Sequence, residues 1–371
     1  MPPTDPPAQR RTRPRSGRIR LDDVAQAAGV SAATASRALR RPELVNEDTR
    51  LRIAAAVKRL GYIPDLAAGG LASDRTGQVA VVVPSLGTPA FIDTIRGISD
   101  TIHPLGLQLV LADTNLSGDN EAALIASLLG RRADAVILTD LAQSPASRAM
   151  LARARIPVVE TWSLTPTPID MNVGFDNRAA GRAVTEHLIA TGRRHIGMIC
   201  GALRMNRRGR DRRAGFLDAT RAASLDDTLI VELPFPVRFR DAAEALAELV
   251  ARNPALDAVF CSGDSFAAGA LFGAQRRGWD VPGKIAIAGL GDLEMTEHLV
   301  PSLSGARIPG YRMGQIAADM LIRRLRGEPV TDRIVDVGFE IVARESTAVG
   351  KGVRPGRCPG PAGAGPQAPL I

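Results

Sequence analysis

Between residues 20 and 62, apolar positions recur every three or four residues, which predicts three short helices. Gly29 ends the first helix, because glycine accepts the positive φ that closes a helix C-terminus. The hydroxyl of Ser31 caps the second helix, and Asn46 caps the third. A helix, a glycine turn and a capped helix of small residues form a helix-turn-helix pattern.

From Gly77 onward the pattern changes to short runs of β-branched residues that end in glycine or polar residues. Seven runs are expected to be strands: 77–86, 107–115, 133–140, 156–162, 195–201, 257–264 and 284–292. Six stretches between or after them have helical spacing: 91–106, 121–132, 178–192, 242–253, 264–278 and 311–327. Alternating strands and helices predict an α/β fold with parallel sheets, and the continuous apolar strands predict sheets covered on both faces.

The α/β region is too long for one doubly wound sheet of ordinary size, so we expect two similar lobes with a cleft between them. The predicted organisation is a disordered basic tail 1–18, a helical headpiece 19–62, a hinge 63–76, a two-lobed domain 77–348 and a disordered tail 349–371. Lobe 1 is expected to hold 77–175 and 309–328, and lobe 2 to hold 176–308 and 329–348.

The excess positive charge is concentrated in the first fifth of the chain. The formal net charge is +8, and residues 1–75 contain 14 Lys and Arg against 8 Asp and Glu. A basic module on a nearly neutral body indicates a nucleic-acid contact. For residues 1–18 alone, a basic tail kept for solubility is an equally good interpretation.

Several classes of protein are disfavoured by composition. No apolar run is long enough for a membrane span, and the Arg-rich N-terminus lacks the apolar core of a secretory signal, so we expect a cytoplasmic protein. Cys200, Cys261 and Cys358 form no CxxC pair, and the four histidines are scattered, so no metal site or cofactor is expected. The segment 289–294 (GLGDLE) lacks the third glycine of a dinucleotide fingerprint, and no nucleophile motif is present, so we expect no enzyme.

The segment VAQAAGVSAATASRALRRPELVNEDTRLRIAAAVKRLGYIP, with its linker and α/β body, resembles the lactose-repressor (LacI) family of bacterial transcription regulators. The resemblance implies a small all-α helix-turn-helix headpiece followed by a two-lobed α/β domain of periplasmic-binding-protein type with parallel sheets. It also implies a homodimer on double-stranded operator DNA, most simply a repressor, controlled by a small sugar or sugar-acid effector. The competing class is a cytoplasmic sugar-binding protein without a DNA role, against which the headpiece argues.

The helix-turn-helix pattern nominates DNA contacts. Arg37 is expected to read a guanine edge, since arginine pairs bidentately with O6 and N7. Ala32 and Ala33 can give only close packing or a thymine-methyl contact, whereas Ser31, Thr34 and Asn46 are candidates for phosphate contacts, which position without specifying.

In the hinge, the resemblance places Leu71 where family members insert a leucine into the minor groove. Gly69 and Gly70 depart from the family's larger residues, and each costs a helix roughly 0.8–1 kcal/mol relative to alanine. A plain flexible linker is therefore the alternative to a hinge helix.

Effector candidates come from the rule that ligands of open α/β sheets bind beyond the C-terminal ends of strands. Trp162 offers a flat ring face, Asp264 a carboxylate for ligand hydroxyls, and the arginines of 204–213 a clamp for an anion. The resemblance aligns Trp162, Arg212 and Asp264 with effector contacts of the family, and 156–183 is similar to members that answer to gluconate-type sugar acids. The alternatives are that Trp162 fills the core, that Asp264 is a plain N-cap, and that most of the arginines are solvated.

Overall fold

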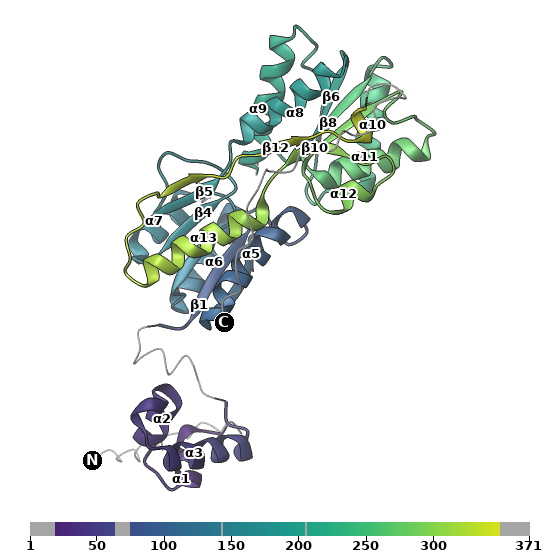
Figure 1. Cartoon of the computed structure of the whole chain (residues 1–371). Helices are drawn as coiled ribbons and strands as arrows, with labels where there is room; N and C mark the ends of the chain where they lie inside the picture. Colours follow the sequence, from purple (N-terminus) through teal and green to yellow (C-terminus); the bar gives the residue numbers. More distant parts are fainter. Residues whose placement is uncertain (1–18, 64–74, 142–143, 205, 349–371) are drawn as a thin grey trace, which may run out of the picture. The chain divides into compact units, whose positions relative to one another are not determined.

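The computed structural model describes residues 19–63, 75–141, 144–204 and 206–348. The chain divides into two compact units with the boundary between Thr76 and Gly77, and each is described by itself (Figure 1). The expected tails 1–18 and 349–371, and Gly69, Gly70 and Leu71 of the hinge, lie outside the described residues.

The headpiece consists of three α-helices and one 3₁₀ turn. Its elements are α1 (Leu21–Ala28), α2 (Ala32–Arg40), η1 (Pro42–Leu44) and α3 (Glu47–Leu60). The predicted caps are confirmed, because the backbone N–H of Thr34 donates to Ser31 Oγ at 3.1 Å and that of Thr49 to Asn46 Oδ1 at 2.9 Å. The core is small: Val24, Ala28, Ala38, Ile53 and Ala56 pack together.

The body contains two six-stranded sheets, which confirms the predicted two-lobed α/β architecture. The sheet of lobe 1 has the order β11-β5-β4-β3-β1-β2 and that of lobe 2 the order β12-β10-β9-β8-β6-β7. The strands of lobe 1 are β1 (Gln78–Val83), β2 (Gln108–Asp113), β3 (Ala135–Leu138), β4 (Val158–Thr161), β5 (Met171–Gly174) and β11 (Ile334–Asp336). Those of lobe 2 are β6 (Ile196–Gly201), β7 (Ile230–Leu233), β8 (Ala258–Cys261), β9 (Ala286–Gly291), β10 (Ser304–Arg307) and β12 (Glu340–Val342). The pairs are parallel except β10–β12.

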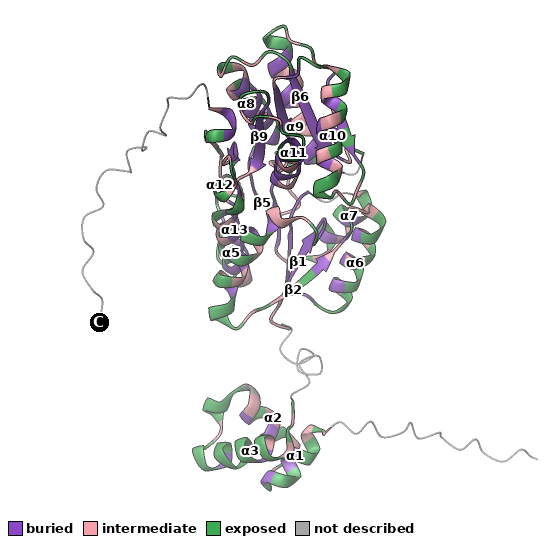
Figure 2. Ribbon diagram, turned by 90° about the vertical axis from the view of Figure 1, so that its right-hand side faces the viewer, coloured by how far each residue is buried: buried purple, intermediate pink, exposed green. Residues whose placement is uncertain are grey.

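Helices cover both faces of each sheet, as the continuous apolar strands predict (Figure 2). The longer helices are α5 (Ile92–Ile102), α6 (Gly118–Gly130), α7 (Pro145–Ala154), α8 (Asn177–Ala190), α9 (Arg207–Ala222), α10 (Phe239–Arg252), α11 (Asp264–Arg276) and α13 (Gly310–Leu325). The short elements are η2 (Pro89–Phe91), η3 (His103–Leu105), α12 (Met295–His298) and η4 (Glu345–Thr347). In lobe 1, residues of α6 and α7 pack with Ala80 and Val82, whereas α5 and α13 pack with Val79 and Val81.

One core cluster continues from one lobe into the other. It joins the α5–α13 side of the first sheet to the α8–α9 side of the second, and includes Val81, Met198 and Phe216. The α10–α11 side of lobe 2 has a separate cluster around Leu246 and Leu271. The cluster includes Phe175 and Ile308, which stand where the chain passes between the lobes, so apolar packing joins the two lobes there.

One predicted lobe boundary is wrong. The sequence predicts residues 329–348 entirely in lobe 2, but β11 pairs in parallel with β5 of lobe 1, with Ile334 opposite Asn172. The chain then turns at Gly338, which has φ 65°, and β12 joins lobe 2. The strands β11 and β12 have three residues each and no helix between them. The sequence therefore gives no sign that the chain passes from lobe 1 to lobe 2 between these two strands.

Candidate functional site

The second helix of the headpiece has one buried side and one exposed side. Ala35 and Ala38 are buried, whereas Ala33 and Arg37, one turn apart, are exposed. Ala32 lies between these extremes. The helix therefore presents small residues and one arginine outward, as a helix that enters a DNA groove requires.

The three candidate phosphate-binding side chains sit at helix starts. Ser31 and Asn46 are exposed while they cap α2 and α3, and the hydroxyls of Ser31 and Thr34 lie 2.9 Å apart. A hydroxyl that accepts from a helix N–H still has a proton to donate, so capping and phosphate contact are compatible at Ser31.

Two other arginines of the headpiece hold helices together. Arg52 Nη1 donates to the carbonyl of Ala28 at 3.3 Å and Arg59 Nη2 to that of Ala27 at 3.4 Å. These carbonyls belong to the last turn of α1, where cations are favourable. Part of the positive charge of the headpiece thus has a structural task.

A cavity of about 150 Å³ lies between the lobes of the body, at the C-terminal ends of strands. Lobe 1 contributes residues 84, 85 and 87–91, Leu116 and Trp162, and lobe 2 contributes residues from α9, the 235–237 loop and the start of α11. The three predicted effector residues, Trp162, Arg212 and Asp264, all line this cavity.

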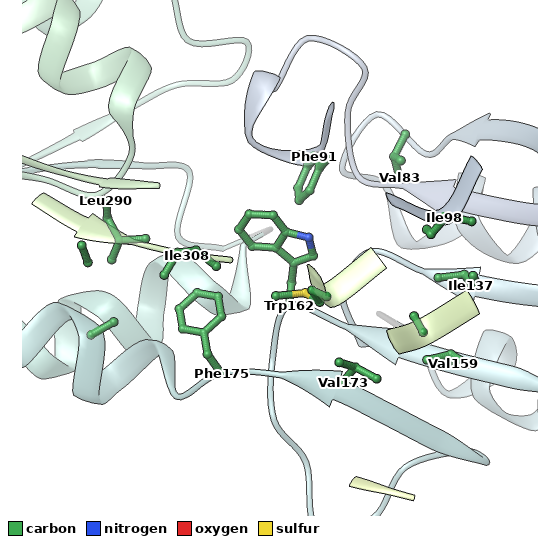
Figure 3. Packing of buried hydrophobic residues seen from close by; sticks show 14 of the residues in the cluster. Val83, Phe91, Ile98, Ile137, Val159, Trp162, Val173, Phe175, Leu290 and Ile308 are labelled. Carbon is green, nitrogen blue, oxygen red and sulfur yellow. The ribbon is translucent and has the colours of Figure 1, made fainter. Parts of the chain in front are cut away.

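Trp162 is part of the core and of the cavity wall at once. Its side chain is 2% exposed and meets Phe91 and Phe175 edge to face, with ring centroids 5.2 and 6.0 Å away (Figure 3). The indole N–H donates to Thr94 Oγ1 at 3.1 Å. The backbone has φ 70°, which is unusual for a bulky residue and is typical of ligand sites. The guanidinium carbon of Arg208 lies 5.7 Å from the centroid of this ring, so Arg208 shares with the cavity the flat face that the sequence analysis expects a sugar to contact.

Two arginines one turn apart on α9 line the same cavity. Arg212 Nε donates to Asn177 Oδ1 at 2.9 Å and Nη1 to the carbonyl of Ser262 at 2.6 Å. Burial and the neighbouring charge of Arg208 lower the pKa of Arg212 to about 9, so it remains a cation at neutral pH. Among the described residues, no carboxylate lies within ion-pair distance of Arg212.

The position of α9 depends on close contact with α8. A Cβ atom at Gly181 would lie 2.4 Å from the carbonyl oxygen of Arg212, and one at Gly215 would lie 2.0 Å from that of Arg178. Both glycines therefore let the two helix backbones approach. This approach brings Arg212 within reach of Asn177, whose amide in turn donates to the carbonyl of Trp162 at 2.8 Å.

Asp264 is the first residue of α11, and the N-cap of this helix is Gly263. The alternative that Asp264 is merely the N-cap is therefore wrong. Its carboxylate accepts from the backbone N–H of Leu293 at 2.8 Å. Gly289 and Gly291 leave room for this carboxylate, since a Cβ at Gly291 would lie 2.5 Å from its Oδ2. Burial raises the pKa of Asp264 from 3.8 to about 6.

The strand-end rule includes Phe91, Asp140 and Arg208 in its ranges, but the sequence did not nominate any of the three as an effector contact. Arg208 is 7% exposed, and its Nε lies 3.1 Å from Asp140 Oδ2. The residue was visible only as one member of a basic run, because 207–222 had not been predicted as a helix. Helical spacing would have placed Arg208 beside Arg212.

Two kinds of feature are missing from the described part of the chain. No group of three or more His, Cys, Asp and Glu side chains there could hold a metal ion. No helix in those same ranges is both long and apolar enough to cross a membrane.

A capped helix-turn-helix unit joined to a two-lobed body with a cavity between the lobes defines the class of DNA-binding regulators that respond to a small molecule. Residues 20–65 match the family described as bacterial regulatory proteins, lacI family. Residues 76–347 match the periplasmic binding proteins and sugar binding domain of LacI family. The chain belongs to the LacI family of transcription regulators, and it is a DNA-binding regulator with an effector-binding domain, not an enzyme.

Named relatives agree with this family. The HTH-type transcriptional regulator GntR of Pseudomonas aeruginosa is 38% identical over 333 residues, covering 90% of this chain and 96% of the relative. The GntR regulator of Escherichia coli is 36% identical over 327 residues, covering 86% and 96%. The crystal structure of a LacI family regulator from Silicibacter pomeroyi superposes with a TM-score of 0.84 at 32% identity, covering 89% of this chain and 99% of that one.

Proposed function

We propose that this regulator is a repressor whose operator binding is controlled by a sugar-acid effector bound in the interlobe cavity. The observation that carries the proposal is Arg212, a guanidinium in the cavity wall whose hydrogen-bond acceptors are the neutral oxygens of Asn177 and Ser262. A partly buried cation whose direct hydrogen-bond partners are neutral oxygens is costly, and a ligand carboxylate supplies a counter-charge in direct contact. The similarity of 156–183 to gluconate-responsive members supports the same ligand class.

Each effector residue then has one role. Arg212 holds the carboxylate, and Asp264 accepts hydrogen bonds from hydroxyls of the sugar chain. Trp162 forms the apolar wall that excludes water. Polar groups that converge in a mostly apolar pocket are the usual design of a small-molecule site.

On DNA, a homodimer would place one α2 in each of two successive major grooves of a pseudo-palindromic operator. Arg37 reads a guanine, Ala32 and Ala33 pack closely, and Ser31, Thr34 and Asn46 hold phosphates. Leu71 of the 63–76 hinge would enter the minor groove. In this organisation 19–62 is the headpiece and 77–348 the effector-binding and dimerisation domain.

Control requires that the effector bind two arrangements of the lobes unequally, because a ligand with equal affinity for both shifts nothing. A cavity with walls from both lobes supports this proposal, because a movement of the lobes would change its shape.

The test is a fluorescence-anisotropy titration of the full chain on its own upstream region, with and without gluconate. We expect tight, salt-sensitive binding that gluconate weakens. Binding that no sugar acid changes would overturn the effector class, and a lack of sequence preference would overturn the operator role.

A further inference from the structure

Arg208 is a buried cation with an incomplete set of partners. Its side chain is 9% exposed and its Nε lies 3.1 Å from Asp140 Oδ2, yet this N–H has no aligned hydrogen-bond acceptor. Arg208 belongs to α9 of lobe 2, whereas Asp140 follows β3 of lobe 1. The contact is therefore an ion pair across the cleft in which the Nε–H does not point at the carboxylate, so the charge attraction is not reinforced by a hydrogen bond from this atom.

Asp140 does not depend on Arg208 to satisfy its carboxylate. Its Oδ1 accepts from the backbone N–H of Leu141 at 2.8 Å and from Ser163 Oγ at 2.9 Å. Both donors belong to lobe 1. If Arg208 turned away, Asp140 would keep these two bonds, so the cost of separating the pair falls mainly on the arginine.

Two aromatic rings of lobe 1 lie against the guanidinium of Arg208. The guanidinium carbon of Arg208 lies 4.7 Å from the ring centroid of Phe91 and 5.7 Å from that of Trp162. Figure 3 shows these two rings turned toward each other. Aromatic walls keep water away and so strengthen every charge interaction between them. Arg208 also lines the effector cavity, so a ligand can reach it.

We propose that Arg208 exchanges partners: Asp140 holds it across the cleft in the effector-free protein, and the carboxylate of a sugar-acid effector takes its place. The inference rests on the proposed function and adds Arg208 as a specificity-determining residue. Arg208 and Arg212 repel each other on one face of α9, and an anion between them removes this repulsion.

The exchange links ligand charge to the contact between lobes. A carboxylate ligand breaks the Arg208–Asp140 pair, which spans the cleft, whereas a neutral polyol of the same shape leaves it in place. The regulator then distinguishes acids from neutral sugars in two ways. An acid binds more tightly, and only an acid separates Arg208 from Asp140. The protein therefore selects between ligands with two groups: Arg208 attracts the ligand carboxylate, and Asp140 competes with the ligand for Arg208.

Calorimetry of Asp140→Asn with gluconate, and with sorbitol as its neutral counterpart, tests the exchange. Asparagine can still accept from Leu141 and Ser163 but no longer competes for the cation. We expect gluconate to bind about tenfold more tightly than to the wild type, in line with one charged hydrogen bond, and sorbitol to bind unchanged. Unchanged or weaker gluconate binding by Asp140→Asn would overturn the exchange.

Two control pairs keep the test decisive. Asp170→Asn removes another lobe 1 carboxylate, one paired with Arg324 away from the cavity, and should leave gluconate affinity unchanged. If Asp140→Asn fails to fold, Arg208→Met provides the second variant: gluconate affinity should fall at least about tenfold and sorbitol affinity should not. Arg210→Met, on the same helix but exposed, should keep both affinities.

The exchange and the proposed function fail differently. If gluconate binds the wild type but Arg208→Met binds it equally well, only the exchange is wrong. If gluconate binds neither the wild type nor Asp140→Asn, the sugar-acid effector itself is wrong and the exchange falls with it.

Discussion

The two walls of the cavity are built from different chemistry. The residues that lobe 1 contributes carry no charge, and their largest side chains are Phe91 and Trp162. The charged residues of the lining, Arg208, Arg212 and Asp264, all come from lobe 2. An uncharged wall facing a charged one makes the strength of every polar contact depend on how closely the lobes approach, because closure removes water from between them.

The two walls also contribute to the stability of the fold in opposite directions. Packing of the aromatic wall stabilises the fold, whereas burial of the charged wall works against stability. Functional sites commonly combine these opposed contributions. Variants on the two walls should therefore shift stability in opposite directions.

The largest expected effect belongs to the aromatic wall. Trp162→Ala removes a ring that is 2% exposed and should lower the free energy of unfolding by about 3–5 kcal/mol, the usual cost of truncating a buried aromatic residue. Urea unfolding followed by circular dichroism measures this loss. Trp279→Ala is the matched control, because that ring is half-buried and packs beside Lys284, so its loss should be smaller. Equal losses would contradict the distinct role of Trp162.

The charged wall should give a stabilising variant with a definite pH dependence. The pKa of Asp264 is raised from 3.8 to about 6, so between these values the folded state binds more protons than the unfolded state. The ionised carboxylate of Asp264 thus lowers the free energy of unfolding by its full amount above pH 6, and this penalty is absent below pH 4, where the carboxyl is protonated. Asp264→Asn should add about 2–3 kcal/mol at pH 8, with the gain disappearing as pH falls to 4. Gluconate response should be lost in the same variant.

The neighbouring Asp292 is a control, because its pKa is shifted in the opposite direction to that of Asp264. Burial acts to raise its pKa, but the hydrogen bonds from Arg344 and Arg307 outweigh burial and lower it. Its contribution to stability is present above the unfolded pKa and is lost as pH falls. Asp292→Asn should therefore destabilise at pH 8, and less so in acid. A gain at pH 8 in both variants, or in neither, would contradict this account of the charged wall.

Much of the fold could be predicted because apolar periodicity is strong in its central strands. The runs around Val79–Val83 and Ile196–Gly201 are buried along their length and read clearly as strands. The strands β5, β7, β10, β11 and β12 were missed, because each has only three or four residues, and SGAR of β10 carries almost no apolar signal. Their place comes from pairing with neighbouring strands, which local sequence does not encode.

The site was predictable in part for a similar reason. Trp162 and Asp264 stand at strand ends, so strand prediction alone placed them. Placing Arg208 in the site requires a prediction of α9. The first two turns of this helix contain no apolar stripe, and its buried face includes Arg208, Gly209 and Gly215. A helix held by backbone contact with α8 gives no hydrophobic periodicity, and the pairing of Arg208 with Asp140 is a contact between distant segments.

The headpiece offers the same contrast between packing and charge on a smaller scale. Arg37 is exposed on α2, whereas Arg52 bonds to the carbonyl of Ala28 and to Thr49 Oγ1. Arg37→Ala should weaken operator binding by about 1–3 kcal/mol and relax specificity at one base pair, without loss of headpiece stability. Arg52→Ala should lower stability by about 1 kcal/mol through its lost hydrogen bonds.

Anisotropy on operator variants and thermal unfolding of the full chain separate these outcomes. A footprint and affinity that Arg37→Ala leaves unchanged would remove Arg37 from base recognition. If Arg37→Ala instead destabilised the headpiece as much as Arg52→Ala, its effect on DNA would be indirect. Loss of specificity with stability retained would identify Arg37 as the residue of α2 that reads sequence, since its exposed neighbour Ala33 has no hydrogen-bonding side chain.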